Sequence, residues 1–284
     1  MRYSSPWSLQ PPLHRTERHE MKPRHTSAHV DTLDFPVHDP PVRSYGTFVP
    51  SQCAASIAGA CSASKLCRNG VDALHRTPPV LPLDRRSIRR GASLYRAGDA
   101  FTHLYQLYSG SVKLRIVNQS GVEQIAAFPM AGALLGLDGI ETGKYTCDVV
   151  ALEHVSVCAL SVADVLALCS HDAEATLLFS KLIAHETTYY RNLLLVLASM
   201  KSDERIANFL LELSGQMAAR GYSRSEFTLK MTREDIANHL GMKLETVSRI
   251  LTRLKVGQIL DVRRRHLKIR DFDALRRIGN GSCE

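Results

Sequence analysis

The amino-acid sequence predicts an α+β protein in which a roll of short strands precedes a long helix and a C-terminal winged helix-turn-helix. Three observations lead to this fold class. Short apolar or alternating segments at 104–108, 112–116 and 124–128 are separated by turn residues. Leucine and isoleucine recur at helical spacing between 172 and 200. Residues 232–253 then carry the spacing of two short helices joined by a glycine turn.

The predicted strands lie within residues 81–170. Their β-branched, aromatic and alternating residues suit a pleated sheet with one buried face. Gly98-Asp99, Ser109-Gly110 and Ser120-Gly121 interrupt them at regular intervals. Regular spacing of strands and turns predicts a closed antiparallel roll or barrel.

A long helix is predicted for residues 171–200. Leu178 and Leu182 lie on one side of it, and the same spacing returns at Leu193 and Leu197. A helix of this length beside a small domain usually packs against a partner, and a second copy of the chain is the obvious candidate. The alternative is a core helix within one chain. A further helix at 202–220 opens with Ser-Asp-Glu, which suits a helix N-terminus.

The helix-turn-helix begins at Thr232, which is predicted to cap its first helix ahead of several acidic residues. Ala237 is small where the two helices cross. Gly241 allows the tight turn, because a left-handed backbone conformation costs glycine least. Val247 then faces inward from the second helix, which completes the spacing of the motif. The same inward face is predicted to hold Leu244, Ile250, Leu251 and Leu254.

The other positions of the second helix face outward and are polar or charged: Lys243, Glu245, Thr246, Ser248, Arg249 and Arg253. Such side chains can read base edges in the major groove of DNA. A hairpin around Arg263-Arg264-Arg265 forms a basic wing suited to phosphates. Between Lys230 and Arg270, eleven Lys and Arg residues stand against four Asp and Glu residues, in a chain of net charge +8. This local excess indicates a polyanionic partner; the alternative is a solvated basic surface.

Residues 1–50 hold eight of the twelve prolines and five of the twelve histidines, without hydrophobic periodicity. Such a segment buries too little apolar surface to offset chain entropy, so a disordered tail is expected. Translation from Met21 is the alternative. The chain has no apolar signal core and no run of about eighteen apolar residues, which predicts a cytoplasmic protein without a membrane span. Seven cysteines in that reducing compartment favour metal or redox chemistry over disulfides.

The order of roll, long helix and winged helix-turn-helix resembles the CRP/FNR family of bacterial regulators over residues 61–274. The most specific motif is Glu245-Thr-Val-Ser-Arg249, which matches the E-x-x-S-R recognition helix of the FNR branch. Arg96-Ala-Gly-Asp99 is also similar to FNR proteins. The resemblance implies a cyclic-nucleotide-binding-like sensor roll (81–170), a dimerisation helix (171–200) and a DNA-binding domain (201–284).

Carried over by position, the resemblance makes Glu245, Ser248 and Arg249 the base-reading residues. Arg249 would bind a guanine through two hydrogen bonds, and Glu245 would accept one from a cytosine or adenine amino group. The implied partners are double-stranded DNA, RNA polymerase and a second copy of the chain. The residues placed to touch the DNA backbone are Thr232, Lys243, Arg253, Arg263, Arg264 and Arg265.

The resemblance also bears on the signal that the roll senses. Members that bind cyclic AMP hold it with a Gly-Glu pair and an Arg-Ser pair, whereas the corresponding positions here are Gly136-Leu137 and Thr146-Cys147. Without the arginine no fixed cation meets the phosphate, so cyclic-nucleotide binding is not expected.

FNR-like members instead carry a four-iron four-sulfur (4Fe-4S) cluster on three N-terminal cysteines and one cysteine of the roll. Cys61-x5-Cys67 matches part of the N-terminal motif, and Cys158 aligns with the internal ligand. Ala58 stands where a further cysteine is expected, and Cys53 is the only substitute. Thiolates are soft ligands suited to iron and sulfide. The resemblance therefore implies a 4Fe-4S cluster held by the roll and an arm at 51–80.

The remaining cysteines receive lesser roles: Cys147 is a weak fifth candidate ligand, and Cys169 and Cys283 are bystanders. On the dimer helix, FNR proteins place a carboxylate that holds the monomers apart when the cluster is lost. This chain has Tyr189-Tyr190-Arg191 there, with Glu186 a turn earlier. Control of dimerisation by oxygen is thus less firmly implied than the cluster.

Three hypotheses remain open at the level of the sequence. The first is an iron-sulfur, redox-responsive transcription factor. The second has the same architecture but senses haem with nitric oxide, an organic ligand or thiol oxidation. The third is a cysteine-metal redox enzyme or electron carrier. An enzyme is disfavoured, because the sequence shows no Walker, Rossmann or Ser/His/Asp constellation and an enzyme leaves the helix-turn-helix unexplained.

Overall fold

The computed structural model describes residues 84–281 of the 284-residue chain. The predicted tail at 1–50, the predicted arm at 51–80 and the first residues of the predicted roll, 81–83, lie outside the described range. Cys53, Cys61 and Cys67 therefore have no structural description, and neither does Cys283. Within 84–281 the elements follow one another as strands, long helices and a helix-rich C-terminal part, which confirms the predicted α+β class.

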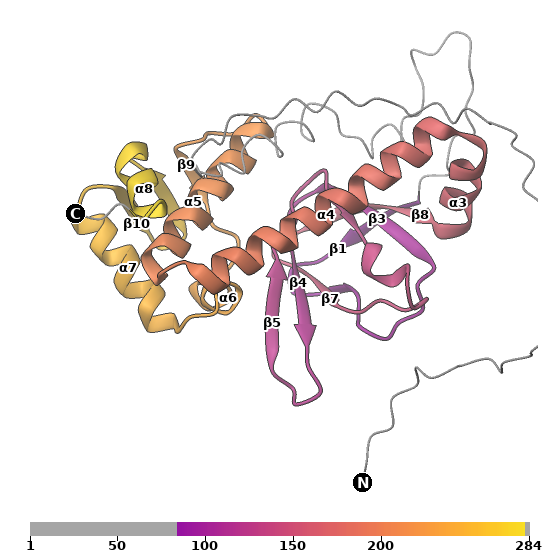
Figure 1. The fold of residues 1–284 in the computed structure, drawn as a ribbon, viewed down its shortest axis with the longest axis horizontal. Coiled ribbons are helices and arrows are strands. Elements are labelled where there is room, and N and C mark those ends of the chain that lie inside the picture. The colour runs from indigo at the N-terminus through magenta and orange to yellow at the C-terminus, as the bar shows by residue number, and fades with distance from the viewer. Residues whose placement is uncertain (1–83, 282–284) are drawn as a thin grey trace, which may run out of the picture. The chain divides into compact units, whose positions relative to one another are not determined.

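The roll consists of two antiparallel sheets (Figure 1). The three predicted strand segments are confirmed as the central part of β3, as β4 and as β5. The first sheet has the order β1 (Asp84–Ile88), β8 (Val155–Ser161), β3 (His103–Ser109) and β6 (Leu134–Leu135). The second has the order β2 (Ser93–Tyr95), β7 (Asp148–Ala151), β4 (Val112–Val117) and β5 (Glu123–Ala127).

Apolar residues of both sheets meet inside the roll. Leu107, Val149 and Val157 are fully enclosed there, as alternation along each strand requires when one face is buried. A short 3-10 helix, η1 (Leu137–Gly139), lies in the connection between β6 and β7. This packing gives the roll an inner core between its two sheets.

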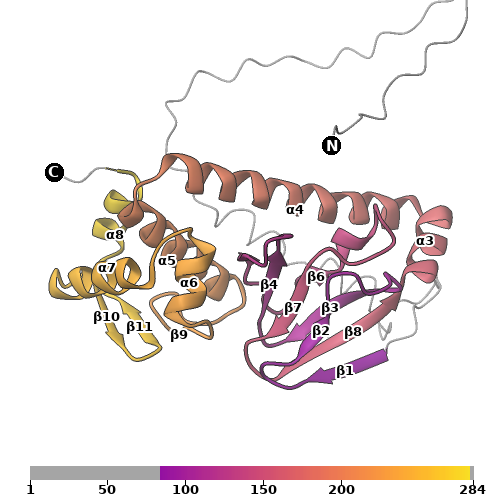
Figure 2. The same ribbon diagram turned by 90° about the horizontal axis from the view of Figure 1, so that it is seen from below.

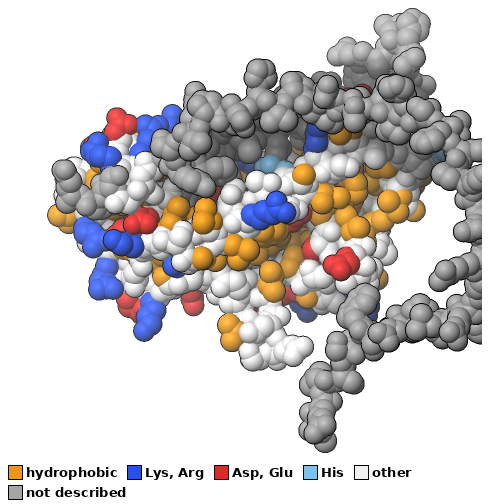
Figure 3. Space-filling model, viewed as in Figure 1, with side chains coloured by type: hydrophobic (Ala, Val, Ile, Leu, Met, Phe, Trp, Pro, Cys, Tyr) orange, Lys and Arg blue, Asp and Glu red, His pale blue; other side chains and the backbone are white. Residues whose placement is uncertain are grey.

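Two helices leave the roll: α3 (Val162–His171) and α4 (Ala173–Ser199). Asp172 caps α4, since its carboxylate accepts hydrogen bonds from the backbone N–H of Glu174 and Ala175. Although α4 runs for 27 residues, Ala175 is its only buried residue. Leu194 and Leu195 are 66% and 60% exposed, and Figure 3 shows hydrophobic side chains gathered along this helix. The predicted long helix is confirmed, and much of its apolar surface stays open within one chain.

We call residues 201–281 the head. It contains α5 (Ser202–Ala219), α6 (Arg233–His239), α7 (Leu244–Val256) and α8 (Phe272–Gly279). Its small antiparallel sheet has the order β10 (Leu260–Arg263), β11 (His266–Ile269) and β9 (Glu226–Thr228), as Figure 2 shows. No helix of the described residues is long and apolar enough to cross a membrane.

The core of the head extends into the roll. Ile206, Leu210 and Leu267 of the head belong to the same buried apolar cluster as Phe128 and Met130 of the roll. Because one hydrophobic cluster crosses the boundary, the head is packed against the roll rather than tethered to it.

Candidate DNA-reading site and sensor surface

The first helix of the helix-turn-helix, α6, begins where the sequence predicted. Thr232 is its N-cap: its hydroxyl oxygen accepts a hydrogen bond from the backbone N–H of Asp235 at 3.0 Å. In return, the Asp235 carboxylate accepts from the Thr232 backbone N–H at 2.8 Å and from its hydroxyl at 2.8 Å. This reciprocal cap satisfies N–H groups at the start of α6, and it occupies the Thr232 hydroxyl within the head.

The turn between α6 and α7 also matches the prediction. Gly241 has a φ of +62°, a conformation that residues with a Cβ adopt only at a cost. Ala237 and Val247 are buried where the two helices cross. The backbone N–H of Met242 donates to the Ala237 carbonyl at 2.9 Å, which closes the end of α6.

The inward face of α7 is formed by Val247, Ile250, Leu251 and Leu254, all buried as predicted. Leu244 is a correction, because it was expected inward and is 42% exposed. Leu244 is the first residue of α7, and the buried stretch of the helix begins only at Val247, nearly one turn later. Helical period alone does not reveal where the neighbouring helix stops covering the face.

The outward face of α7 carries the predicted base-reading residues. Glu245 and Arg249 are exposed and Ser248 is half-buried. Neither Glu245 nor Arg249 forms an ion pair with another described residue, and the bond from Arg249 to the Thr246 hydroxyl is long, at 3.5 Å. A shallow hollow of about 440 Å³ is lined by Ser248, Arg249, Thr252, Arg253 and Val256. The structure thus gathers Ser248 and Arg249 on one open surface, with donors left for an outside partner.

Arg253 and Lys243 flank this surface. Arg253 pairs with Asp203 at the start of α5, so its charge is partly met within the head. Lys243 is the N-cap of α7 and is exposed. Arg253 lines the hollow, whereas Lys243 lies at the start of α7 and does not line it.

The wing is the hairpin of β10 and β11, which is closed by Arg264 and Arg265 between the paired residues Arg263 and His266. Arg264 has a φ of +58°, in the left-handed region that favours glycine. Arg265 donates to the Lys230 carbonyl at 3.2 Å. Arg263 and Arg264 are exposed. The three wing arginines therefore form a basic tip, as predicted, and one of them sits there in a strained conformation.

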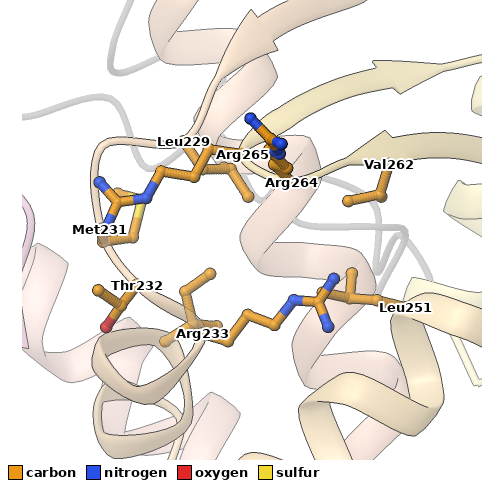
Figure 4. Close-up of a pocket in the computed structure, with 9 residues that line it drawn as sticks. Leu229, Met231, Thr232, Arg233, Leu251, Val262, Arg264 and Arg265 are labelled. Atoms are coloured by element: carbon orange, nitrogen blue, oxygen red, sulfur yellow. The ribbon is translucent and has the colours of Figure 1, made fainter.

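A second cavity of about 270 Å³ opens between the wing and α6 (Figure 4). Its floor includes Leu229, Ile236 and Val262. Arg233 lies on one side of it and Arg264 and Arg265 on the other. The sequence analysis missed Arg233, although its place directly after the helix cap was a usable signal for a phosphate contact.

In the roll, the position expected to hold a nucleotide phosphate is filled by the chain itself. One Asp138 carboxylate oxygen accepts from the backbone N–H of Thr146 at 2.6 Å, from its hydroxyl at 3.0 Å and from the N–H of Cys147 at 3.2 Å. The ring of Tyr145 stacks on Tyr95 with centroids 3.8 Å apart. A phosphate would meet a carboxylate here, which supports the expectation that cyclic nucleotides do not bind.

Two described cysteines lie on opposite faces of the roll. Cys147 belongs to the inner core; burial, with Asp138 close by, raises the pKa of its thiol well above the ordinary value. Cys158 lies between Val157 and Ala159, which face that core, so alternation turns its side chain to the outer face of the sheet. Its register neighbours are Arg85 on β1 and Gln106 on β3.

Cys147 and Cys158 are about equally buried, at 4% and 3% exposed, and they differ in the face of the sheet that each occupies. A metal ligand must be a thiolate. Cys158 is 3% exposed and not engaged in a disulfide, and it faces away from the packed interior. Among residues 84–281 no group of three or more His, Cys, Asp or Glu residues could hold a metal, so a cluster requires ligands from elsewhere in the chain.

Glu186 of α4 lies against the same inner region of the roll. Burial and the neighbouring Asp138 carboxylate raise its pKa to about 7. The Tyr190 hydroxyl donates to it at 3.4 Å. The carboxyl group noted in the sequence is thus held midway along α4, close to Asp138 of the roll.

Comparison with known proteins decides the family. The model of the Crp-like helix-turn-helix domain matches residues 204–278, and that of the cyclic nucleotide-binding domain matches residues 85–172. Transcriptional regulatory protein btr of Bordetella pertussis is 35% identical over 201 residues, which cover 70% of this chain and 83% of that protein. This chain belongs to the CRP/FNR family of transcription regulators.

Other members of the CRP/FNR family agree. The chain is 32% identical to transcriptional activator protein FnrA of Stutzerimonas stutzeri, over 81% of this chain and 92% of that one. It is 35% identical to the fumarate and nitrate reduction regulatory protein of Escherichia coli K12, over 67% and 76%. The structure of FixK2 from Bradyrhizobium japonicum superposes with a TM-score of 0.64 at 28% identity, covering 70% of this chain and 98% of that one. The family resemblance read from the sequence is confirmed, and with it a DNA-binding helix-turn-helix in a transcription regulator.

Proposed function

We propose that this CRP/FNR regulator binds a palindromic, FNR-like DNA site as a homodimer and responds to oxygen or redox state through a 4Fe-4S cluster. The observation that carries the proposal is the outward face of α7, where Arg249 and Glu245 are exposed and have no ion-pair partner among the described residues. Base-edge readout needs donors and acceptors that the protein itself does not satisfy.

In this proposal Glu245, Ser248 and Arg249 read bases. The backbone contacts come from the cap positions Thr232 and Lys243, from Arg253 and from the wing residues Arg263, Arg264 and Arg265, with Arg233 added from the cavity beside the wing. Phosphate contacts fix the register of the protein on DNA, while base contacts give specificity. The base contacts thus come from α7 alone, and the backbone contacts come from α6, α7 and the wing.

The homodimer is supported by the open apolar surface of α4. A 27-residue helix with Ala175 as its single buried residue leaves leucines exposed, and pairing two such helices removes that surface from water. A two-fold dimer places two recognition helices one helical turn of DNA apart, roughly 34 Å. The resemblance to FNR proteins implies half-sites like TTGAT.

For the sensor, we propose that Cys158, Cys61, Cys67 and Cys53 bind one cluster, which ties the arm at 51–80 to the outer face of the roll. When bound, the cluster supplies oxygen-labile iron-sulfur chemistry. The support from this chain is the donor type and direction of Cys158, together with relatives named as fumarate and nitrate reduction regulators. RNA polymerase as a partner, a cytoplasmic location and the domain limits 81–170, 171–200 and 201–284 belong to the same proposal.

The alternative is a regulator of the same architecture with another signal: haem with nitric oxide, an organic ligand or thiol oxidation. The observation that favours it is that Ala58 occupies a position expected to be cysteine.

Anaerobic purification tests both readings. The proposal predicts iron and acid-labile sulfide in the protein, a broad absorption band that air bleaches, and stronger binding to the palindromic DNA before bleaching. A sharp Soret band would instead identify haem. Protein that binds the palindrome equally well with and without air, and holds neither iron nor haem, would contradict the cluster while leaving the DNA function in place.

A further inference from the structure

The second sheet of the roll ends at β5, and among residues 84–281 no strand lies beside its outer edge. Edge strands leave backbone N–H and C=O groups unpaired. Here the edge is met by α6, the first helix of the helix-turn-helix, although 113 positions in sequence separate Ile125 from Asn238. The contact therefore joins the roll to the part of the head that carries the recognition helix.

The side-chain amide of Asn238 pairs with this edge on both sides. The backbone N–H of Ile125 donates to Asn238 Oδ1 at 2.5 Å, and Asn238 Nδ2 donates to the Glu123 carbonyl at 2.9 Å. An amide with one donor and one acceptor can satisfy two backbone groups of a strand in the way that the peptide group of a neighbouring strand does. Asn238 thus completes β5 from a helix.

Gln124 of β5 makes the reverse contact. Its Nε2 donates to the Asn238 carbonyl at 2.7 Å and to the His239 carbonyl at 3.3 Å. These carbonyls lie in the last turn of α6, and that of Asn238 also accepts from the backbone N–H of Gly241 at 3.2 Å. Gln124 of β5 therefore binds the end of α6, while Asn238 of α6 binds the edge of β5. These reciprocal hydrogen bonds fix the position of α6 along the strand.

Two further contacts extend this attachment along α6. His239 is buried and its Nδ1 donates to the Ile125 carbonyl at 2.9 Å, since a carbonyl can only accept. One turn earlier, Lys113 of β4 pairs with Asp235 at 2.6 Å, and Asp235 also closes the N-terminal cap of α6. The helix is held to the roll at both ends.

None of these side chains belongs to the reading surface. Ser248, Arg249 and the wing point elsewhere, while α7 packs on α6 through Ala237 and Val247. Moving α6 on β5 would therefore move α7 with it, together with Thr232 and Arg233 at the start of α6.

We propose that Asn238 and Gln124 are positioning residues for DNA reading: they fix the angle and place of the recognition helix relative to the roll. The proposal rests on the proposed homodimer and its two-half-site DNA. When two rolls are joined through α4, the attachment of each head sets the distance between the two recognition helices. The molecule should then accept one spacing of half-sites and resist others.

The test uses Gln124→Glu and Asn238→Asp in the full chain. Gln124 is exposed, so its replacement leaves the core intact, but a carboxylate would face two carbonyl oxygens at a helix C-terminus. Asn238→Asp keeps the shape while losing the donor to Glu123. Binding is measured on duplexes in which two half-sites are moved apart or together by single base pairs, and on a duplex with one half-site.

The wild-type protein should bind one spacing best. Each variant should lose about tenfold at that spacing, with a smaller difference between spacings, while binding to one half-site changes little. Asn208→Asp is the matched control, because Asn208 also donates to a backbone carbonyl, that of Gly279 at 2.8 Å, but inside the head. This control should lower the melting temperature and keep the spacing preference.

Two outcomes separate the ideas. Variants that keep the wild-type spacing preference would overturn the positioning role. A wild-type protein with no preference for the palindrome over unrelated DNA would instead overturn the proposed function on which it rests.

Discussion

The head and the roll each hold a cluster of polar groups, and the two clusters differ in whether these groups have partners within the described part of the protein. On α7 the side chains of Glu245 and Arg249 extend outward, with no ion-pair partner among the described residues. In the roll, the donors around Thr146 and Cys147 are all taken by Asp138. Polar groups without partners in the protein are available to bind another molecule, whereas polar groups that are hydrogen-bonded to one another stabilise the fold. A match to a ligand-binding family model therefore does not by itself identify a ligand site.

The largest effect is expected when the cysteines on the inner and outer faces of the roll are replaced. Cys158→Ser should abolish cluster content and anaerobic regulation, since three ligands leave an iron open to solvent. Cys61→Ser and Cys67→Ser should do the same. Cys147→Ser, inside the core, should retain the cluster, as should Cys169→Ser and Cys283→Ser. Iron and sulfide assays on anaerobic protein give the readout.

Cys53→Ser tests the least regular of the proposed ligands. It should lose the cluster like the other three. If Cys53→Ser kept full iron and sulfide while Cys147→Ser lost them, the inner cysteine would be the fourth ligand, and the contrast between inner and outer faces would be wrong.

On the head, Arg249→Ala should weaken binding to the specific site by about 1–3 kcal/mol and leave binding to unrelated DNA nearly unchanged, because one two-bond contact to a guanine is lost. Arg277→Ala, on α8 and also exposed, is the matched control with equal loss of charge. Titrations on specific and scrambled duplexes measure both. Unchanged specificity in Arg249→Ala would mean that the reading surface is misplaced.

The Glu186 carboxyl group, which lies near Asp138 of the roll, should change how the free energy of unfolding depends on pH. Burial, with Asp138 beside it, raises the pKa of Glu186 to about 7 from the ordinary 4.5, so the folded state holds the proton more tightly than the unfolded state. The contribution of Glu186 to stability is then fullest below its ordinary pKa of 4.5 and declines as the pH rises toward 7. Glu212 on α5, also raised to about 7 by burial, adds to the decline.

Glu186→Gln should remove one part of that decline and gain ~1–2 kcal/mol over the wild-type protein above pH 7, after allowance for solvent screening. Denaturant melts at several pH values measure the effect. Glu141→Gln changes an exposed glutamate outside the cluster and should follow the wild-type curve. A Glu186→Gln curve parallel to the wild type would show that the carboxyl is solvated.

The smallest expected effect lies at the wing tip. Arg264→Gly should stabilise the fold by ~1 kcal/mol, because a φ of +58° costs an arginine what it does not cost a glycine. The same change should weaken binding to all DNA sequences alike and lower the salt slope by about one, since one phosphate contact is lost. Thermal melts and salt titrations would show the two effects with opposite sign. A loss of stability would mean that Arg264 is held by contacts rather than strained.

A feature of the fold or the site could be predicted from the sequence when the residues that determine it lie close together in the chain. The cap at Thr232, the turn at Gly241 and the outward face of α7 were predicted, because each depends on residues within two helical turns. Leu244 was misplaced, since its exposure depends on where α6 ends.

Three features of the site stayed hidden in the sequence for a different reason. The pairing of Asn238 with β5 joins residues 113 positions apart, and the cation Lys113 meets Asp235 across 122. The insertion of Asp138 beneath Thr146 depends on a left-handed backbone at Gly136 just before η1. Sequence periodicity predicts which face of a helix or strand is buried, but it does not predict which sheet edge packs against which helix.

Asp138 has a consequence for how the roll could be controlled. Its carboxylate is part of the chain, so its local concentration at the donors of Thr146 and Cys147 is fixed and no dilution removes it. A diffusible effector acts through mass action, and its occupancy follows its abundance in the cell. The interior of this roll instead holds a permanent hydrogen-bond acceptor, Asp138, which behaves like a ligand that never leaves. A small anion would have to displace that carboxylate before it could reach the donors of Thr146 and Cys147.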